Sequence, residues 1–321
     1  MMEVEDIGGY FGLELNENVL LPHADGAYLN TGRNALEYVL RSLSCIKKIF
    51  IPYFTCDVIL EPIKKIGAEY DFYHINEKLE LDDDIILRDN EYLFVINYFG
   101  IKDDYIYRLT QKYRENIIVD NSQAFFSLHI DGVKTIYSPR KFIGVPDGGI
   151  AYGASHAESS YEIDVSFDRC SHLLKRIDVG AGMGYKDFKD NSLKLSNQPI
   201  RRMSALTKRI ISSIDFEEIK RKRIANFVFL NDRLSFSNAL CIEGQFACPM
   251  VYPYFTSNVD LRRELIEKHI FVATYWPNVL KDCPSSFVEH KLAEMIIPLP
   301  IDQRYTYKEM ERICEIINMC K

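Results

Sequence analysis

The first half of the chain alternates between two hydrophobic periods, and this alternation limits the possible folds more than any other feature. Short apolar segments have the length of strands, and helix-length segments at 34–43, 57–67 and 103–114 separate several of them. Strands joined by helices form βαβ units and a mainly parallel sheet. We therefore predict an α/β fold with a large domain over residues 1–200. The predicted strands are 48–52, 71–75, 92–97, 116–120, 135–138 and 148–153.

The second half has a different pattern. A polar interruption at 185–200 marks the predicted domain boundary, and a long basic helix follows at about 202–232. Strands are predicted within 246–255 and at 271–276 and 295–300, a helix at 259–269, and a terminal helix that opens with the capping box Thr306-x-x-Glu309. Residues 201–321 are thus predicted to hold a connecting helix and a small C-terminal α+β domain.

Composition excludes several classes of protein. The 321 residues are 47% hydrophobic and 26% charged, as in ordinary globular proteins. The 39 basic and 46 acidic residues give a net charge of −7, which argues against a nucleic-acid or anionic-membrane partner. No apolar run approaches the ~20 residues of a membrane span. The acidic N-terminus lacks a basic region followed by an apolar one, so we expect no secretory signal and a cytoplasmic protein.

The eight cysteines indicate neither a disulfide framework nor a metal site. None forms a C-x-x-C pair, and no Cys/His cluster has zinc spacing. We expect free thiols in a reducing compartment, and no metal.

Two candidate chemical groups follow predicted strands, where parallel sheets bind ligands. Asp120 comes directly after the apolar segment 117–119. It is either a functional acid or an ordinary turn former. Lys141 lies among Phe142, Ile143 and Val145, before a Gly-Gly pair. We expect a partly apolar environment there, which would lower the pKa of the lysine and make its amine a nucleophile; the alternative is a solvated surface lysine.

A third group is the segment Thr31-Gly32-Arg33-Asn34 at the start of a predicted helix. Free N–H groups and the positive end of the helix dipole suit a phosphate, and a simple helix cap is the alternative. A reactive lysine, an upstream acid and a phosphate cradle together are what pyridoxal 5′-phosphate (PLP) requires.

At this point the chain resembles a known family. Segments in order along nearly the whole chain resemble the DegT/StrS-type nucleotide-sugar aminotransferases, PLP enzymes with the aspartate-aminotransferase fold (fold type I). These segments include IGGYFGLEL, LNTGRNALEYVL, IFIPYFTCDVILEPIKKIGAEYDFYHI, VINYFG, VDNSQAF, SPRKFIGVPDGG, RRMS, TYWPNVL and IIPLPIDQRYTYKEMERICEII.

The resemblance implies a role for each matching residue. Lys141 would form the Schiff base with PLP and later move the proton, while Asp120 would pair with the pyridine N–H. Gln123 would bond the 3′-oxygen of the cofactor. The phosphate would be held by Gly32, Arg33, Asn34 and Ser138. Tyr275 and Trp276 would line the substrate pocket, although Trp276 fits core packing equally well.

The chain departs from the family pattern at several places, and one is Ser138, which stands closer to the lysine than the family's usual serine. Cys56 stands where many members have an aromatic residue that stacks on the pyridine ring. Residues 200–203 read Ile-Arg-Arg-Met where the family has Asn-Tyr-Arg-Met, whose Asn reaches the neighbouring subunit's cofactor.

The implied activity is transfer of an amino group from glutamate or glutamine to a nucleotide-linked keto sugar, for amino-sugar or surface-polysaccharide biosynthesis, by a homodimer. Three alternatives remain open. One is a PLP-dependent keto-sugar dehydratase, although known members have His in place of the lysine. The second is a non-catalytic binding or regulatory protein with this fold. The third is a nicotinamide-dependent oxidoreductase, which leaves the lysine motif unexplained.

Overall fold

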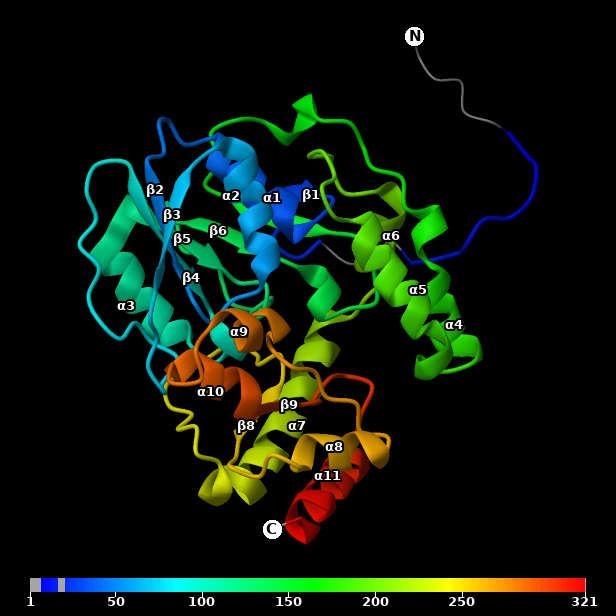
Figure 1. Cartoon of the computed structure of the whole chain (residues 1–321). Helices are drawn as coiled ribbons and strands as arrows, with labels where there is room; N and C mark the ends of the chain where they lie inside the picture. Colours follow the sequence, from blue (N-terminus) through cyan, green and yellow to red (C-terminus); the bar gives the residue numbers. More distant parts are fainter. Residues whose placement is uncertain (1–6, 17–20, 321) are drawn as a thin grey trace.

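The computed structural model describes residues 7–16 and 21–320 and has an α/β architecture (Figure 1). Its central sheet has seven strands in the order β1-β7-β6-β5-β4-β2-β3, and a separate sheet pairs β8 with β9. Only β7 runs antiparallel to its neighbours in the large sheet. The mainly parallel sheet and the small second sheet confirm the predicted fold class. The strands are β1 Ala27–Leu29, β2 Lys48–Pro52, β3 Glu69–Tyr73, β4 Glu91–Ile96, β5 Ile117–Asp120, β6 Lys134–Tyr137, β7 Gly149–Tyr152, β8 Tyr252–Phe255 and β9 Ile296–Leu299.

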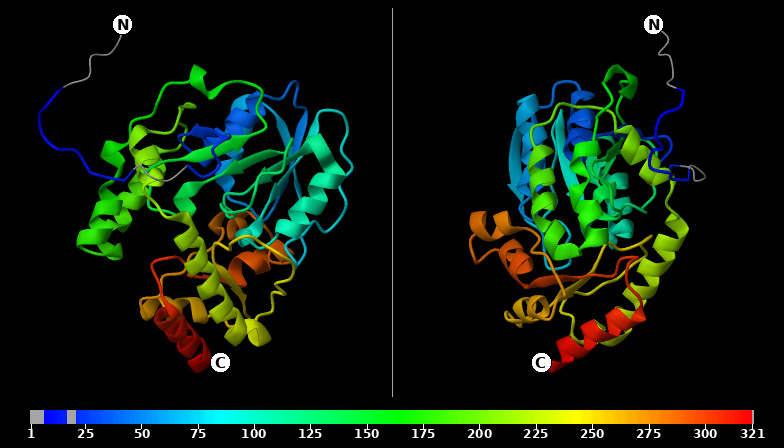
Figure 2. Two further views of the ribbon diagram at one scale, coloured as in Figure 1. Left: turned by 180° about the vertical axis from the view of Figure 1, so that it is seen from behind. Right: turned by 90° about the vertical axis from the view of Figure 1, so that its right-hand side faces the viewer.

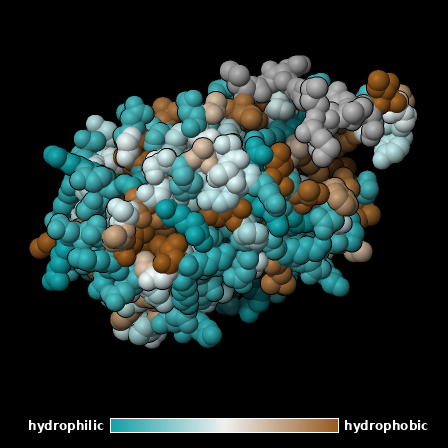
Figure 3. Space-filling model, turned by 90° about the horizontal axis from the view of Figure 1, so that it is seen from above, coloured by the Kyte–Doolittle hydropathy of each residue, from teal (hydrophilic) through white to brown (hydrophobic). Residues whose placement is uncertain are grey.

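Helices flank the large sheet, and the small sheet lies with α7, α8, α10 and α11 at one end of the molecule (Figures 1 and 2). Seen from above, the surface is mainly hydrophilic with separate hydrophobic patches (Figure 3). The α-helices are α1 Gly32–Arg41, α2 Leu60–Ile66, α3 Asp103–Tyr113, α4 Ser171–Asp178, α5 Ala181–Lys194, α6 Ala205–Ser212, α7 Phe216–Leu234, α8 Leu261–Glu267, α9 Pro277–Asp282, α10 Val288–Met295 and α11 Tyr307–Met319.

The start of α2 differs from its prediction. The predicted helix begins at residue 57, but Asp57–Ile59 form a 3₁₀ turn and α2 itself begins at Leu60. The N-cap residue of this turn, Cys56, makes no side-chain capping bond. The predicted end is confirmed, because Gly67 closes α2 in the left-handed conformation with φ of 73°.

The predicted long helix at 202–232 is two helices, α6 and α7. Asp215 interrupts it: its carboxylate accepts a hydrogen bond from the Glu218 N–H at 2.9 Å and so caps α7. The polar interruption at 185–200 also contains helix, since α5 runs to Lys194. The predicted strand at 271–276 is absent, whereas the capping box of Thr306 and Glu309 is confirmed.

Among the described residues, no helix combines the length and apolar character needed to cross a membrane. The same residues contain no cluster of three or more His, Cys, Asp or Glu side chains that could hold a metal ion. Residues 1–6, where the N-terminus was expected to lack a secretory signal, lie outside the described residues.

The contact between β7 and the start of α1 leaves no room for a side chain at Gly149. A Cβ atom there would lie 2.2 Å from the Thr31 carbonyl oxygen, which is backbone and cannot rotate away. We expect Gly149→Ala to lower the free energy of unfolding by more than about 2 kcal/mol. Gly182→Ala in α5 is the control, since nothing lies within 4 Å of its Cβ position. Equal urea midpoints for the two variants would contradict this close packing.

Candidate functional site

Asp120 and Lys141 follow neighbouring parallel strands, at the same edge of the large sheet. Asp120 is the last residue of β5 and pairs with Ile136 of β6. Its side chain is buried, and one carboxylate oxygen accepts a hydrogen bond from the Ser122 N–H at 2.7 Å. The chain leaves β6 through Ser138 and a 3₁₀ turn, Pro139–Lys141. The fold therefore brings the predicted acid and the predicted lysine to one end of the sheet.

Lys141 is more accessible than its sequence neighbours suggest. Phe142, Ile143 and Val145 are buried as expected, but Lys141 itself is exposed, and its side-chain amine has no hydrogen-bond or ion-pair partner among the described residues. The expectation of a partly apolar environment is wrong for the isolated chain, because the apolar side chains turn into the core and the lysine turns outward. What remains is an accessible primary amine.

Cys56 lies close enough to Lys141 for the charge of the lysine to affect the pKa of the thiol. Burial raises the pKa of the Cys56 thiol, while the Val58 N–H and the positive charge of Lys141 act in the opposite direction. The structure therefore brings the cysteine, in the position of the expected stacking aromatic, near the lysine.

Gln123 presents a buried amide group that lacks one partner. Its side-chain oxygen accepts a hydrogen bond from the Phe99 N–H at 2.7 Å, but its Nε2 group is buried with no partner among the described residues. The Thr55 hydroxyl, beside Cys56, is likewise buried and unpartnered. A buried donor without an acceptor costs about 1–3 kcal/mol. Both groups are thus free to bond a ligand.

The start of α1 faces two serine hydroxyls. A Cβ atom at Gly32 would lie 3.8 Å from Ser138 Oγ and 3.9 Å from Ser122 Oγ, so both oxygens border the space that the missing side chain leaves. No described residue accepts from or donates to either hydroxyl. A helix N-terminus next to two free hydroxyls is a suitable cradle for a phosphate.

The side chains of Arg33 and Asn34 are engaged within the protein. Arg33 Nη1 donates to Glu61 at 3.1 Å and to Ser196 at 2.9 Å. Asn34 is buried, and its amide donates to Asn30 at 2.6 Å and to the Pro199 carbonyl at 2.7 Å. Its backbone N–H donates to the Thr31 hydroxyl, so the helix also has the simple cap that was the alternative interpretation.

Tyr275 and Trp276 pack against the loops that border the site. The Trp276 ring is buried and lies 5.1 Å from the Phe54 ring, while the Tyr275 ring lies 6.2 Å from that of Phe99. Burial raises the pKa of Tyr275 to about 12, although the nearby Arg223 opposes this. Trp276 therefore belongs to the core.

Sequence reasoning missed three polar residues here. Ser122 could have been found, because it stands between Asp120 and Gln123, and Thr55 directly precedes Cys56. Asn278 carried no signal: it lies in α9, far along the chain, and donates to the Thr55 carbonyl oxygen at 2.9 Å.

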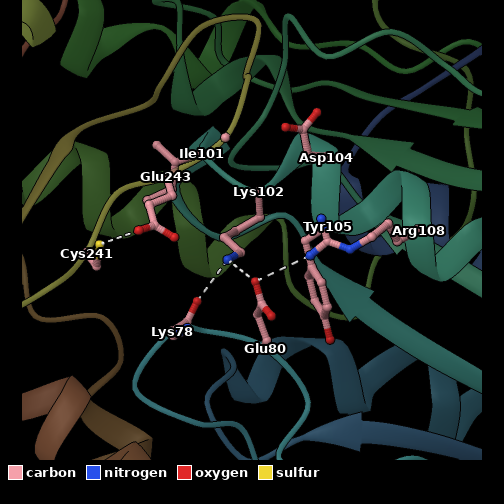
Figure 4. A pocket seen from close by; sticks show the side chains of 10 residues that line it. Lys78, Glu80, Ile101, Lys102, Asp104, Tyr105, Arg108, Cys241 and Glu243 are labelled. Carbon is pink, nitrogen blue, oxygen red and sulfur yellow. Dashed lines mark hydrogen bonds and ion pairs between the residues drawn. The ribbon is translucent and has the colours of Figure 1, made fainter.

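A separate pocket of about 230 Å³ lies beside α3 and the segment 241–244 (Figure 4). Its charged groups are largely paired with one another: Lys102 contacts Glu80 at 2.5 Å, and the Cys241 thiol contacts Glu243 at 3.1 Å. None of the predicted site residues lines this pocket.

Comparison with known proteins agrees with the sequence resemblance at the level of fold. No family model and no curated protein matches the chain. Among solved structures, the sugar aminotransferase CalS13 from Micromonospora echinospora is 13% identical, with a TM-score of 0.62 over 92% of this chain and 87% of that one.

Two further structures are similar. A DegT/DnrJ/EryC1/StrS aminotransferase from Brucella abortus is 16% identical, with a TM-score of 0.59 over 92% of this chain and 85% of its own. NtdA from Bacillus subtilis, solved with bound cofactor PMP, is 13% identical, with a TM-score of 0.63 over 92% of this chain and 73% of that one. The chain therefore has the fold of the DegT/DnrJ/EryC1/StrS-type aminotransferases, which its motifs resemble.

Proposed function

We propose that this protein is a PLP-dependent aminotransferase that transfers an amino group from glutamate or glutamine to a nucleotide-linked keto sugar. The observation that carries the proposal is that Lys141 and Asp120 follow neighbouring strands at one end of the sheet, where the hydroxyls of Ser122 and Ser138 border the start of α1. The sugar-aminotransferase fold supports the same activity. Amino-sugar or surface-polysaccharide biosynthesis in the cytoplasm is the context that we propose.

The residues present fit the cofactor. PLP has a phosphate, a 3′-oxygen and a pyridine nitrogen, and the site offers an unsatisfied group for each. Ser122 and Ser138 border the glycine at the helix start, the buried Gln123 amide lacks an acceptor, and one oxygen of Asp120 has no partner among the described residues. When bound, PLP would supply an aldehyde for covalent attachment and an electron sink.

Each residue would then have one task. The Lys141 amine would bond the cofactor aldehyde. Once released by the amino donor, it would take the proton from the donor Cα and deliver it to the former aldehyde carbon of the cofactor. The Asp120 carboxylate would hold the proton on the pyridine nitrogen. Gln123 Nε2 would donate to the 3′-oxygen, and the two serines with Gly32 would hold the phosphate. The Ser122 N–H orients Asp120 for this role.

A homodimer is part of the proposal. Many large apolar side chains between residues 163 and 193 are exposed in the single chain, which is unusual for so short a segment. The segment packs against the loop after Lys141, since Asn191 donates to the Pro146 carbonyl oxygen at 2.8 Å. Burial of this surface by a second copy would also shield Lys141. The exposed residues are Ile163, Val165, Phe167, Leu174, Ile177, Val179, Met183, Tyr185, Phe188 and Leu193.

The visible absorption spectrum tests the proposal. Wild-type protein with PLP should develop a yellow band that is absent in Lys141→Ala, and glutamate should bleach it. A band that forms but does not respond to amino donors would point to another PLP reaction, such as dehydration. Absence of any band would support a non-catalytic protein with this fold.

The serine pair gives a prediction about cofactor affinity. Hydrogen bonds to charged groups contribute about 1.5–3 kcal/mol each. The double variant Ser122→Ala, Ser138→Ala should therefore bind PLP at least about tenfold more weakly, with little change in affinity for pyridoxal, which lacks the phosphate. Spectroscopic titration measures both constants, and Ser192→Ala on α5 is the control. An equal loss for the two ligands would contradict a phosphate role.

A further inference from the structure

We propose that Arg140, together with the Nε group of Arg169, forms a binding subsite for a phosphate-class anion next to Lys141. The subsite extends the proposed function, since PLP and a nucleotide-linked sugar both carry phosphate groups. Its anion affinity can nevertheless be measured without any chemistry at the lysine.

The first observation is that the Arg140 guanidinium has no hydrogen-bond or ion-pair partner among the described residues, although the residue is only partly exposed. A guanidinium has five donors and stays protonated. Such a charge is costly to bury without an anion. The neighbouring polar groups do not offer one, because they are already bonded elsewhere.

Asp147 is the carboxylate that acts on Arg140, and it is engaged with another cation, as are Asp164 beside Arg169 and Glu61 beside Arg33. Asp147 accepts from Arg169 at 3.1 Å, and Asp164 from the same guanidinium at 2.7 Å. Glu61 accepts from Arg33 at 3.1 Å and lies 3.1 Å from Lys65. None of these ion pairs therefore neutralises the positive charge of Arg140.

The second observation is another donor without an acceptor. Arg169 Nε is buried and unpartnered among the described residues, as is Nδ1 of His172. Burial lowers the pKa of Arg140 to about 10. The positive charges of Arg33 and Arg169 act in the same direction, and the Asp147 carboxylate opposes them. Burial also lowers the pKa of His172, and Arg140 adds to this effect. Two carboxylates, those of Asp147 and Asp164, thus face the guanidinium groups of Arg140, Arg169 and Arg201, so positive charge is in excess in this region.

The position of the site indicates which anion it takes. Arg140 belongs to the same turn as Lys141 and directly follows the segment of Ser138, whose hydroxyl borders Gly32. Arginine forks match phosphate oxygens in geometry and charge. The anion is either the cofactor phosphate or the diphosphate of the nucleotide sugar, which share this chemistry.

Calorimetric titration of the cofactor-free full chain with inorganic phosphate and pyrophosphate tests the subsite. We expect Arg140→Gln to weaken binding at least tenfold, Arg140→Lys to weaken it less, and Arg176→Gln, at an exposed position on α4, to leave it unchanged. Because Arg140 has no protein partner, Arg140→Gln should not lower the melting temperature of the cofactor-free protein. Unchanged anion affinity in Arg140→Gln, or a lowered melting temperature, would overturn the proposal.

PLP and pyridoxal separate the two sources of phosphate. If Arg140 binds the cofactor phosphate, Arg140→Gln loses affinity for PLP but not for pyridoxal. If it binds the sugar-linked diphosphate, PLP affinity is kept and pyrophosphate affinity is lost. Lys141→Ala should still bind phosphate. If the protein binds phosphate but Lys141 does not react with PLP, the proposed function is refuted and the anion subsite still stands.

Discussion

Lys141→Ala is expected to reduce the rate of amino transfer from glutamate by at least about 10⁴-fold, because one side chain supplies both the covalent attachment and the proton-transfer group. Lys141 is exposed, and its amine makes no hydrogen bond or ion pair with the described residues, so removal of the side chain should leave the fold intact. Single-turnover kinetics with PLP-loaded protein measure the rate, and circular dichroism checks the fold.

The control for this variant is Lys308→Ala, which removes an exposed lysine from α11, away from the strand ends. It should react like the wild type. Substantial activity in Lys141→Ala would mean that another amine performs the chemistry, and the site assignment would then be wrong.

Asp120→Asn is expected to slow amino transfer by about 10²-fold or more, since a preorganised charge next to the reacting group would be lost. The asparagine keeps the shape of the side chain, and its amide oxygen can still accept the hydrogen bond from the Ser122 N–H. Stability should therefore change much less than the rate. Comparison of single-turnover rates with urea midpoints separates the two effects.

Asp120→Glu serves as the companion variant, because it keeps the charge but lengthens the side chain. We expect it to retain more activity than Asp120→Asn. The opposite order, or equal loss of stability and activity in Asp120→Asn, would show that Asp120 supports only the turn after β5.

The parallel strands could be predicted from the sequence because their signal is local. β2 lies at the predicted residues 48–52, and β5 differs by one residue from 116–120. Both are short apolar runs between polar segments, and fully buried parallel strands produce this pattern. The sheet itself places the polar residues that follow such strands. For this reason the sequence alone could predict that Asp120 and Lys141 lie at the same end of the sheet.

Helix interruptions were harder to predict. The pattern at 202–232 is compatible with one helix, but Asp215 caps α7 and ends that continuity. A cap residue competes locally with the helical backbone, and hydrophobic periodicity does not report this competition.

Side-chain surroundings depend on tertiary contacts and could not be predicted. Lys141 was expected to be desolvated by its apolar neighbours, but those side chains point into the core and leave the lysine outside. The unpartnered state of Arg140 also depends on distant residues, since Asp147 and Asp164 are occupied by Arg169. Such competition for partners appears only once the chain is folded.

The most direct test of the central proposal is to locate the covalent bond between the protein and the cofactor. Borohydride reduction of the PLP-loaded protein makes this bond permanent, and peptide mass spectrometry then identifies the modified residue. We expect the label on Lys141 in the wild type and no stoichiometric label in Lys141→Ala. A label on a different lysine, or none on the wild type, would contradict the assignment of Lys141 as the cofactor-binding residue.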